Sequence, residues 1–405
     1  MTEGEAPFEP HAGTVDMIVA VHDTRRDIRR AVSSILSDHD RTIRAFVVAH
    51  NLDRAEVEHE LSDLLEAYPG RVRIEELKDG IPSPSGPFNF GMTESDAEYV
   101  GIMGSDDELD TGAIAQWRET AERYDADAVI AKVVRGEQRT LVRSPPKRLF
   151  RTGRLDFARD RLSYRSAPLG IMRRSAVKTL ELELLPGARN GGDLPFVTRL
   201  WAGGRVVPAQ GLAAYVEHAD APVRVTHVAK PVAEELAALV ATLDDPVVQA
   251  MSRASKEAFV TKLLRRNLTD SVRKRDHGRG FTEEDLAAMR DIVQRLDTMA
   301  PRARGMLSVA QARMFEELLS DGPDLDRVAA HDAASLRYRS ADALLPASLS
   351  LLLHSQAQPR FMVASASIKI GASRYFPIAR LVVLAGVVLV GAVVVASVVL
   401  GRRRG

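Results

Sequence analysis

Cysteine is absent from the 405 residues of this chain. Its absence excludes a disulfide framework, a thiolate nucleophile and a cysteine-based zinc site, so any catalysis must use oxygen and nitrogen groups. An excess of one charge is also absent, because basic and acidic residues number 55 each. No overall electric field therefore attracts nucleic acid, and we expect no nucleic-acid partner.

The N-terminal residues lack the features of a secretory signal. They read MTEGEAPFEPHAG, without a basic segment that leads into an apolar core. We expect residues 1–13 to be a flexible N-terminus and the bulk of the chain to stay in the cytosol. The composition, 45% hydrophobic and 27% charged, is typical of globular proteins, and the length indicates two or three domains.

One long apolar run lies near the C-terminus. Residues 381–400, LVVLAGVVLVGAVVVASVVL, carry no charge, and at roughly 1.5 Å per residue such a helix spans a bilayer. Arg380 precedes this run and Arg402–Arg404 follow it, as is common at membrane interfaces. The alternative is a buried core helix. We expect a single-pass protein of the cell membrane with a cytoplasmic catalytic part, and a linker or membrane-proximal segment at 344–380.

Hydrophobic patterning predicts an α/β fold over residues 14–230. The pattern predicts strands at 14–20, 43–49, 72–77, 98–103 and 128–134, and helices at 25–36, 56–67, 88–94 and 111–124. Strands that alternate with helices favour a parallel twisted sheet. Residues 231–343 are almost wholly helical in pattern and predict an α-helical C-terminal domain, with helices at 234–243, 246–270, 282–299 and 307–319.

Two adjacent carboxylates follow the predicted strand 98–103. Asp106 and Asp107 would lie at the carboxyl end of this strand, where ligands bind in open α/β sheets. Their oxygens suit Mg²⁺ or Mn²⁺, and a cation can neutralise the charge that grows on a departing diphosphate. The alternative is a plain turn or helix N-cap.

A third carboxylate lies at a loop-to-helix junction. Asp193, within RNGGDLPFVTRL, could deprotonate an acceptor hydroxyl as a general base. It could equally be the helix N-cap. A basic run, formed by Arg265, Arg266, Arg273, Lys274 and Arg275, indicates a solvated helix face or a surface for anionic lipid or acceptor.

The order of several motifs resembles a known family. VHDTRRDIRRAVSSIL, PFNFGM, IMGSDDELD, RSAPLGIMRRSAV and NGGDLPFVTRLWAGGRV follow one another between residues 15 and 227. This order resembles the inverting family 2 glycosyltransferases, which have a GT-A fold. The resemblance implies a GT-A-like nucleotide-binding sheet flanked by helices, a divalent metal cofactor and a nucleotide-sugar donor.

The resemblance also implies roles for single residues. Asp106 and Asp107 match the acidic motif that binds metal and diphosphate, with Asp107 in direct metal contact, and Asp193 matches the catalytic base. His218 resembles a late histidine near the metal. Donor-binding positions fall on Ala20, Val21, His22, Asp23, His50, Asn51 and Asn89, where His50 or Asn51 replaces an acidic residue that usually meets the uracil.

Several positions depart from the family pattern. Gly104 stands where many members have the first aspartate of the acidic motif, and Gly192 replaces the glutamate before the catalytic base. Phe88 occupies the usual place of an arginine. These changes bear on the identity of the donor more than on the chemistry, since all three aspartates remain.

Three functions fit these residues. The first is an inverting transferase that moves a sugar, with UDP as the expected nucleotide, to a hydroxyl of a cell-envelope glycan or lipid-linked acceptor. The second is a catalytically degenerate, membrane-tethered scaffold of the same fold, which the glycines at 104 and 192 suggest. A nucleotidyltransferase is disfavoured, because VHDTRRDIRR lacks the glycines of a phosphate-binding loop. An oligomer is compatible with all three.

Overall fold

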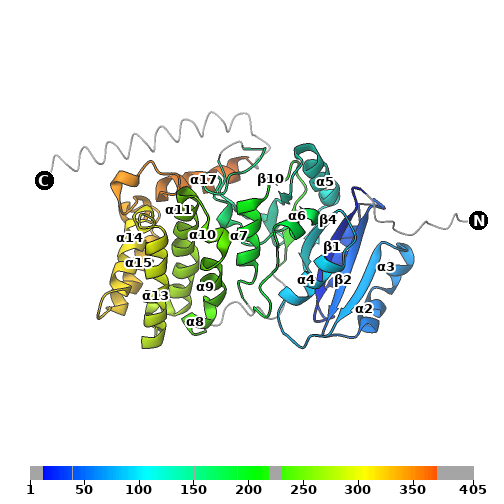
Figure 1. Ribbon diagram of the computed structural model, residues 1–405, viewed down its shortest axis with the longest axis horizontal. Coiled ribbons are helices and arrows are strands. Elements are labelled where there is room, and N and C mark those ends of the chain that lie inside the picture. The colour runs from blue at the N-terminus through cyan, green and yellow to red at the C-terminus, as the bar shows by residue number, and fades with distance from the viewer. Residues whose placement is uncertain (1–11, 39, 149–150, 189, 219–229, 372–405) are drawn as a thin grey trace, which may run out of the picture.

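A seven-stranded sheet forms the N-terminal half of the protein (Figure 1). The computed structural model describes residues 12–38, 40–148, 151–188, 190–218 and 230–371. The strand order is β10-β6-β9-β4-β1-β2-β3. The strands are β1 (Val15–Val21), β2 (Ile43–His50), β3 (Val72–Leu77), β4 (Tyr99–Gly104), β6 (Ala128–Ile130), β9 (Gly170–Arg173) and β10 (Val206–Pro208).

The sheet is parallel except around one strand. β1 pairs in parallel with β2 and β4, β2 with β3, and β10 with β6. β9 lies antiparallel between β4 and β6, an exception that the pattern of alternating strands and helices did not indicate.

A second, four-stranded sheet has the order β5-β11-β7-β8. Its strands are β5 (Glu108–Leu109), β7 (Val133–Arg135), β8 (Thr140–Leu141) and β11 (Tyr215–Glu217). The prediction of one strand over 128–134 was therefore wrong. The chain leaves the large sheet after Ile130 and joins the small sheet at Val133, so one apolar run serves two sheets.

Helices cover both faces of the large sheet and close one core on each. Successive side chains of β1 point to opposite faces of the sheet. Met17 and Val19 therefore join one buried cluster, and Ile18 joins the other. The helices of the first face are α1 (Ile28–Leu36), α2 (Arg54–Glu60), α3 (Ser62–Ala67) and α5 (Ala113–Tyr124). Those of the second are α4 (Ser85–Glu94), α6 (Arg174–Thr179) and α7 (Asp193–Gly203).

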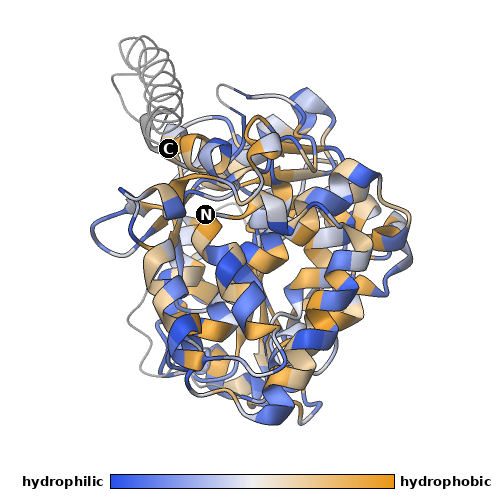
Figure 2. Ribbon diagram, turned by 90° about the vertical axis from the view of Figure 1, so that its left-hand side faces the viewer, coloured by the Kyte–Doolittle hydropathy of each residue, from blue (hydrophilic) through white to orange (hydrophobic). Residues whose placement is uncertain are grey.

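The C-terminal part is helical, as predicted. In Figure 2 its helices carry both hydrophilic and hydrophobic stretches, which suits helices with one buried side. Its elements are α8 (Val232–Glu235), α9 (Ala237–Leu243), α10 (Pro246–Gln249), α11 (Arg253–Lys262), the π-helical turn η3 (Leu263–Leu268), α12 (Thr269–Lys274), α13 (Glu283–Met299), α14 (Val309–Leu318), α15 (Leu325–Ser335), α16 (Ala341–Leu344) and α17 (Gln358–Gly371). Short 3-10 turns lie at η1 (Leu162–Tyr164), η4 (Asp276–Gly278), η5 (Arg304–Met306) and η6 (Leu349–Leu351).

The predicted helix 246–270 is interrupted in the structure. α10 ends at Gln249, and the side chain of Ser252 caps a new helix by accepting a hydrogen bond from the Ser255 amide. After Lys262 the helical hydrogen bonds change to the wider π-helical pattern of η3, a geometry that often accompanies functional sites. A helical period in sequence does not reveal either change.

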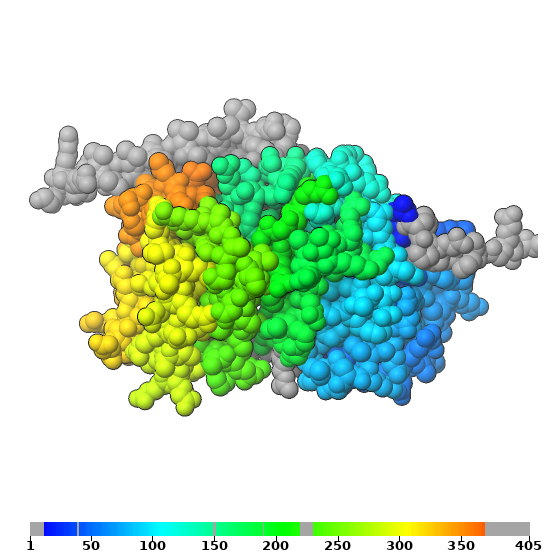
Figure 3. Space-filling view, viewed as in Figure 1, coloured from blue at the N-terminus to red at the C-terminus, as the bar shows by residue number. Residues whose placement is uncertain are grey.

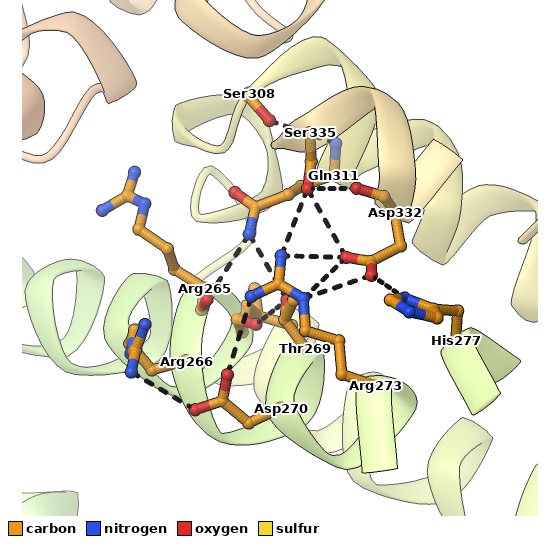
Figure 4. A network of polar contacts seen from close by, with 11 residues as sticks. Arg265, Arg266, Thr269, Asp270, Arg273, His277, Ser308, Gln311, Asp332 and Ser335 are labelled. Carbon is orange, nitrogen blue, oxygen red and sulfur yellow. Dashed lines mark hydrogen bonds and ion pairs between the residues drawn. The ribbon is translucent and has the colours of Figure 1, made fainter. Parts of the chain in front are cut away.

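A buried polar network stabilises this helical part (Figure 4). The fully buried carboxylate of Asp332 accepts a hydrogen bond from Arg273 Nε at 2.9 Å and lies 2.7 Å from His277 Nδ1. The interpretation of the basic run as a solvated face was wrong for Arg265 and Arg275, each only 4% exposed. Arg265 instead donates to Tyr164 Oη and to two backbone carbonyls, and so ties η3 to segments far along the chain.

The predicted membrane span, 381–400, lies outside the described residues. Within the ranges that the structure describes, no helix is long and apolar enough to cross a bilayer. The segment 344–380, expected to be a linker or membrane-proximal, contains the turn η6 and the helix α17 within the described residues.

A buried ion pair between neighbouring residues of β1 and β2 gives a test of stability. Asp16 is fully buried and accepts two hydrogen bonds from Arg44 at 2.8 Å, and one from Ser95 Oγ at 2.6 Å. We expect Asp16→Ala to lower the free energy of unfolding by about 3–5 kcal/mol, because it removes the buried partner of a buried guanidinium. Asp16→Ala combined with Arg44→Met should recover part of this loss in urea melts. Additive losses would contradict this account.

Candidate active site

The carboxyl ends of three neighbouring strands meet at one edge of the large sheet. Val21 pairs with Ala49, and Ala20 pairs with Gly104, so β1, β2 and β4 end at the same level. The loops that follow them carry His22, Asp23, Asn51, Asp106 and Asp107. This edge is the usual ligand-binding place in open α/β sheets.

A cavity of about 540 Å³ opens beside β4. Four predicted site residues line it together: Asp106, Asp107, Asp193 and His218. Asp193 arrives from the N-terminus of α7 and His218 from the end of β11, so segments far apart in sequence face one space. Its other lining residues include Ser85, Phe88, Arg135, Leu184, Asn190, Gly192, Tyr215 and Glu217.

Asp107 is held by two hydrogen bonds. Its Oδ2 accepts from Tyr215 Oη at 2.6 Å, and its Oδ1 accepts from the backbone amide of His218 at 3.0 Å. Burial nevertheless raises the pKa of Asp107 to about 6, with the neighbouring charge of Asp106 acting in the same direction. A desolvated carboxylate of this kind favours a cation beside it.

Asp106 faces two arginines of the first loop and helix. Its carboxylate lies 3.2 Å from Arg26 Nη1, while its backbone carbonyl accepts a hydrogen bond from Arg30. Positive charge therefore stands at the edge of the cavity on the side of β1. The motif VHDTRRDIRR contains these arginines, yet their spacing alone did not indicate that they would reach Asp106.

His218 lies next to a carboxylate that the sequence did not single out. Its Nε2 is 3.0 Å from Glu108 Oε2, and Glu108 belongs to β5, which pairs with β11. The pairing of these two short strands explains why Tyr215 and His218 reach Asp107. The role of His218 as a metal ligand stays a prediction.

Asp193 begins α7 and borders the cavity. Burial raises the pKa of its carboxyl to about 6, and the positive charge of Lys262 partly opposes this shift. Its carboxylate makes no side-chain hydrogen bond to another part of the chain that the structure describes. The N-cap position itself is occupied by Gly192, so the alternative of Asp193 as the N-cap is wrong.

Lys262, at the end of α11, faces this aspartate from the helical part. Only 5% of Lys262 is exposed, and burial lowers its pKa to about 8 against the attraction of Asp193. Among the described residues its ammonium has no hydrogen bond or ion pair within the usual distances. Sequence reasoning missed this lysine, because nothing local distinguishes it from a surface residue.

The predicted donor-binding residues after β1 lie around the sheet edge. Ala20 and Val21 end the strand, and Asp23 forms an ion pair with Arg25 at 2.7 Å. That hydrogen-bonded arginine holds the pKa of Asp23 well below its usual value. Partial desolvation and then the charge of Arg26 lower the pKa of His22, whose ring also senses His50 and Asp106.

At the end of β2, a missed aspartate joins two predicted residues. His50 Nε2 lies 2.9 Å from Asp79 Oδ1, and Asn51 Nδ2 donates to the same oxygen at 3.2 Å. Asp79 belongs to the loop between β3 and α4. It brings a carboxylate to the place where the resemblance implied an acidic residue and the local sequence had none.

Asn89 has a structural task in addition to its predicted one. Its amide donates to the Leu184 carbonyl at 2.8 Å, and its oxygen accepts from the Leu184 amide at 2.9 Å. These bonds fix the loop that leads to Asp193. A direct contact of Asn89 with the donor stays a prediction.

The two glycine departures have steric reasons. A Cβ at Gly192 would lie 2.8 Å from Ser85 Oγ and 3.0 Å from Ala188 Cβ, so no glutamate fits without movement. A Cβ at Gly104 would lie 2.6 Å from Asp107 Oδ2. Ser85 and Ala188 thus occupy the space for a side chain at residue 192, and Asp107 occupies that at residue 104.

The donor set fits a divalent metal that substrate helps to hold. In the described ranges no three histidine or acidic side chains converge on one point. Mg²⁺-type ions, however, commonly take one or two carboxylates and complete their shell with water and phosphate oxygens. Asp107, desolvated and beside Asp106, suits this arrangement.

The raised pKa of Asp193 gives a second test. The pKa of Asp193 in the folded protein is above its unfolded value of 3.8. Protonation of Asp193 therefore adds its whole contribution to the free energy of unfolding below about pH 4, and this contribution is lost as the pH rises to about 6. We expect Asp193→Asn to raise the free energy of unfolding at pH 7.5 by at most about 3 kcal/mol, seen as a higher unfolding temperature. At pH 4 we expect no such effect. Asp291→Asn, on the exposed side of α13, is the control. An equal effect of Asp193→Asn at both pH values would refute the assignment.

Known proteins resemble this chain in sequence and in fold. Residues 16–181 match the family described as Glycosyl transferase family 2. TarP of Staphylococcus aureus strain N315, a poly(ribitol-phosphate) β-N-acetylglucosaminyltransferase, is 24% identical over 186 residues, which are 45% of this chain and 55% of TarP. The match therefore spans about half the length of this curated relative.

Solved structures of S. aureus TarS share the fold. The crystal structure of TarS 1–349 superposes with a TM-score of 0.61 at 14% identity and covers 80% of this chain and 91% of TarS 1–349. Its complex with UDP-GlcNAc gives a TM-score of 0.63 at the same identity and the same coverage of both chains. Residues 16–181 of this chain thus resemble the family 2 glycosyltransferases in sequence, and the chain shares the fold of TarS.

Proposed function

We propose that this protein transfers a sugar from a UDP-linked donor to a hydroxyl of a cell-envelope glycan or lipid-linked acceptor, with inversion at the anomeric carbon. One observation carries the proposal: the carboxylates of Asp106, Asp107 and Asp193 line the same cavity. In this proposal Asp106 and Asp107 form the diphosphate-binding side, Asp193 is the base, and the sugar lies in the cavity that all three line.

The cavity residues suit a single displacement. The acceptor oxygen attacks the anomeric carbon, the bond from that carbon to the diphosphate oxygen breaks, and Asp193 takes the hydroxyl proton. The pKa of about 6 leaves Asp193 ionised at neutral pH and more basic than an ordinary carboxylate. Bound Mn²⁺ or Mg²⁺, held by Asp107 and Asp106, would neutralise charge on the leaving diphosphate. Arg26 lies at the same edge and can bind diphosphate oxygens.

UDP-N-acetylglucosamine is the first donor to test. TarS has been crystallised with this compound and with UDP, and TarP carries an N-acetylglucosaminyltransferase name. Asp79, beside His50 and Asn51, supplies a carboxylate for the nucleotide base.

The helical part supports an anionic acceptor. Lys262 carries a buried ammonium whose positive charge acts on Asp193, and a buried cation favours a negatively charged partner. A polyol-phosphate polymer, of the kind named for TarP, fits this charge. We further propose that residues 381–400 anchor the chain in the cell membrane, with the catalytic part cytoplasmic, where a lipid-linked acceptor is available.

The central test is transfer from UDP-N-acetylglucosamine to a poly(ribitol phosphate) acceptor in the presence of Mn²⁺. We expect Asp193→Ala and Asp107→Ala each to lower kcat about 10²–10⁴-fold, because each removes a group used in the transition state. Asp291→Ala should leave kcat unchanged. If UDP with Mn²⁺ does not raise the melting temperature and no UDP-hexose supports turnover, the chain is the degenerate scaffold.

Lys262→Gln tests the acceptor side separately. The positive charge of Lys262 lowers the pKa of Asp193, so its removal raises that pKa and moves the acidic limb of the kcat/KM profile to higher pH. We also expect KM for the phosphate-containing acceptor to rise about tenfold while KM for the donor stays constant. Lys256→Gln, on the same helix, is the matched control. An unchanged pH profile would show that Lys262 does not act on Asp193.

A further inference from the structure

Exposed apolar side chains gather in the C-terminal part of the described chain. Of the nine large hydrophobic residues that are prominently exposed among those described, five lie between 336 and 363. Leu353 is 81% exposed, and Leu349 and Tyr338 are 58% exposed each. The other two are Leu336 and Val363, at 41% and 37%. Single exposed leucines are ordinary, but a cluster of this kind marks an interaction surface.

Contacts between these segments place them on neighbouring parts of the surface. Arg360 Nη1 lies 3.5 Å from the Leu353 carbonyl, and one helical turn later α17 presents Val363. Gln358 Nε2 donates to the carbonyl of Ala343 in α16, which directly follows the turn that holds Leu336 and Tyr338. Figures 1 and 3 show the orange segments of this part together along the upper edge of the molecule.

The charge of this surface is positive. Arg337, Arg339 and Arg360 are exposed and form no ion pair with any carboxylate in the described ranges. Asp342 is the last acidic residue of the sequence, and it pairs with Arg313 at 3.6 Å. Every charged side chain after it is basic.

We propose that this surface, made of Leu336–Arg339, Leu349, Leu353, Arg360 and Val363, lies against an anionic lipid bilayer. Leucine and valine side chains would enter the boundary between headgroups and acyl chains, Tyr338 would sit at the headgroup level, and the three arginines would bind anionic headgroups. The sequence favours this occupant, because the uncharged run 381–400 begins ten residues after α17 ends. The inference rests on the membrane anchoring in the proposed function, and it adds which side of the catalytic part faces lipid.

The absence of cysteine makes the surface accessible to single-site labelling. The full-length protein with Leu353→Cys, and separately Leu349→Cys, is labelled with a polarity-sensitive fluorophore and reconstituted into phosphatidylcholine vesicles with or without phosphatidylglycerol. The lipids carry a quencher at a shallow acyl position. Ile81→Cys, 44% exposed in the loop between β3 and α4, is the control.

We expect a blue shift and loss of roughly half of the emission at positions 349 and 353 in anionic vesicles, and almost no quenching at position 81. Replacing Arg337, Arg339 and Arg360 together by Gln should weaken the quenching severalfold, because anionic lipid no longer holds the surface. The same replacement at Arg54, Arg123 and Arg279, which are exposed elsewhere, should not.

Other occupants give different results. Vesicle-bound protein whose labels at 349 and 353 are not quenched would overturn the proposal, since the catalytic part would then stand away from the bilayer. Labels that are already shielded without lipid would show that residues 372–405 or a second copy cover the surface. Transfer activity, measured on the same labelled protein in detergent, is independent of each of these outcomes and reports on the proposed function alone.

Discussion

The in-register parallel pairing of β1 with β2 and β4 is the constraint on which the site depends. Because both faces of these strands are buried, their middle positions are apolar. The paired Asp16 and Arg44 lie near the start of β1 and β2, and the other charged side chains appear where the strands end. The common register places those ends at one edge. The side of the cavity that carries Asp106 and Asp107 is therefore a product of sheet packing, while Asp193 comes from elsewhere, after the loop that Asn89 fixes.

Much of the sheet could be predicted from the sequence because its strands are continuous apolar runs. Patterning predicted strands at 43–49 and 72–77, and the structure has β2 at Ile43–His50 and β3 at Val72–Leu77. Patterning failed at 128–134, where one run contributes to two sheets, and at 246–270, where capping and a π turn interrupt a helical period. Both failures come from tertiary contacts that a local period does not contain.

The candidate site was predictable only in part. Motif order identified Asp106, Asp107 and Asp193, and these residues do share a cavity. Three residues were missed: Tyr215, which binds Asp107, Asp79, which contacts His50, and Lys262, whose charge acts on Asp193. Each belongs to a separate element whose own sequence reads as ordinary strand, loop or helix. A Cβ at Gly104 or Gly192 would approach neighbouring side chains closely, so both departures have a steric explanation that does not depend on degeneracy.

The hydrophobic cluster that starts on the large sheet has a consequence for how the chain folds. It runs without a break from Ile18 and Phe46 through Phe196 on α7 to Phe259 and Phe315 in the helical part. A protein cut after residue 230 would expose to water the side of α7 that packs against α9 and α10. Folding of the half that contains the sheet is thus coupled to the helices that follow, and the interacting charges of Lys262 and Asp193 come together as the shared core forms.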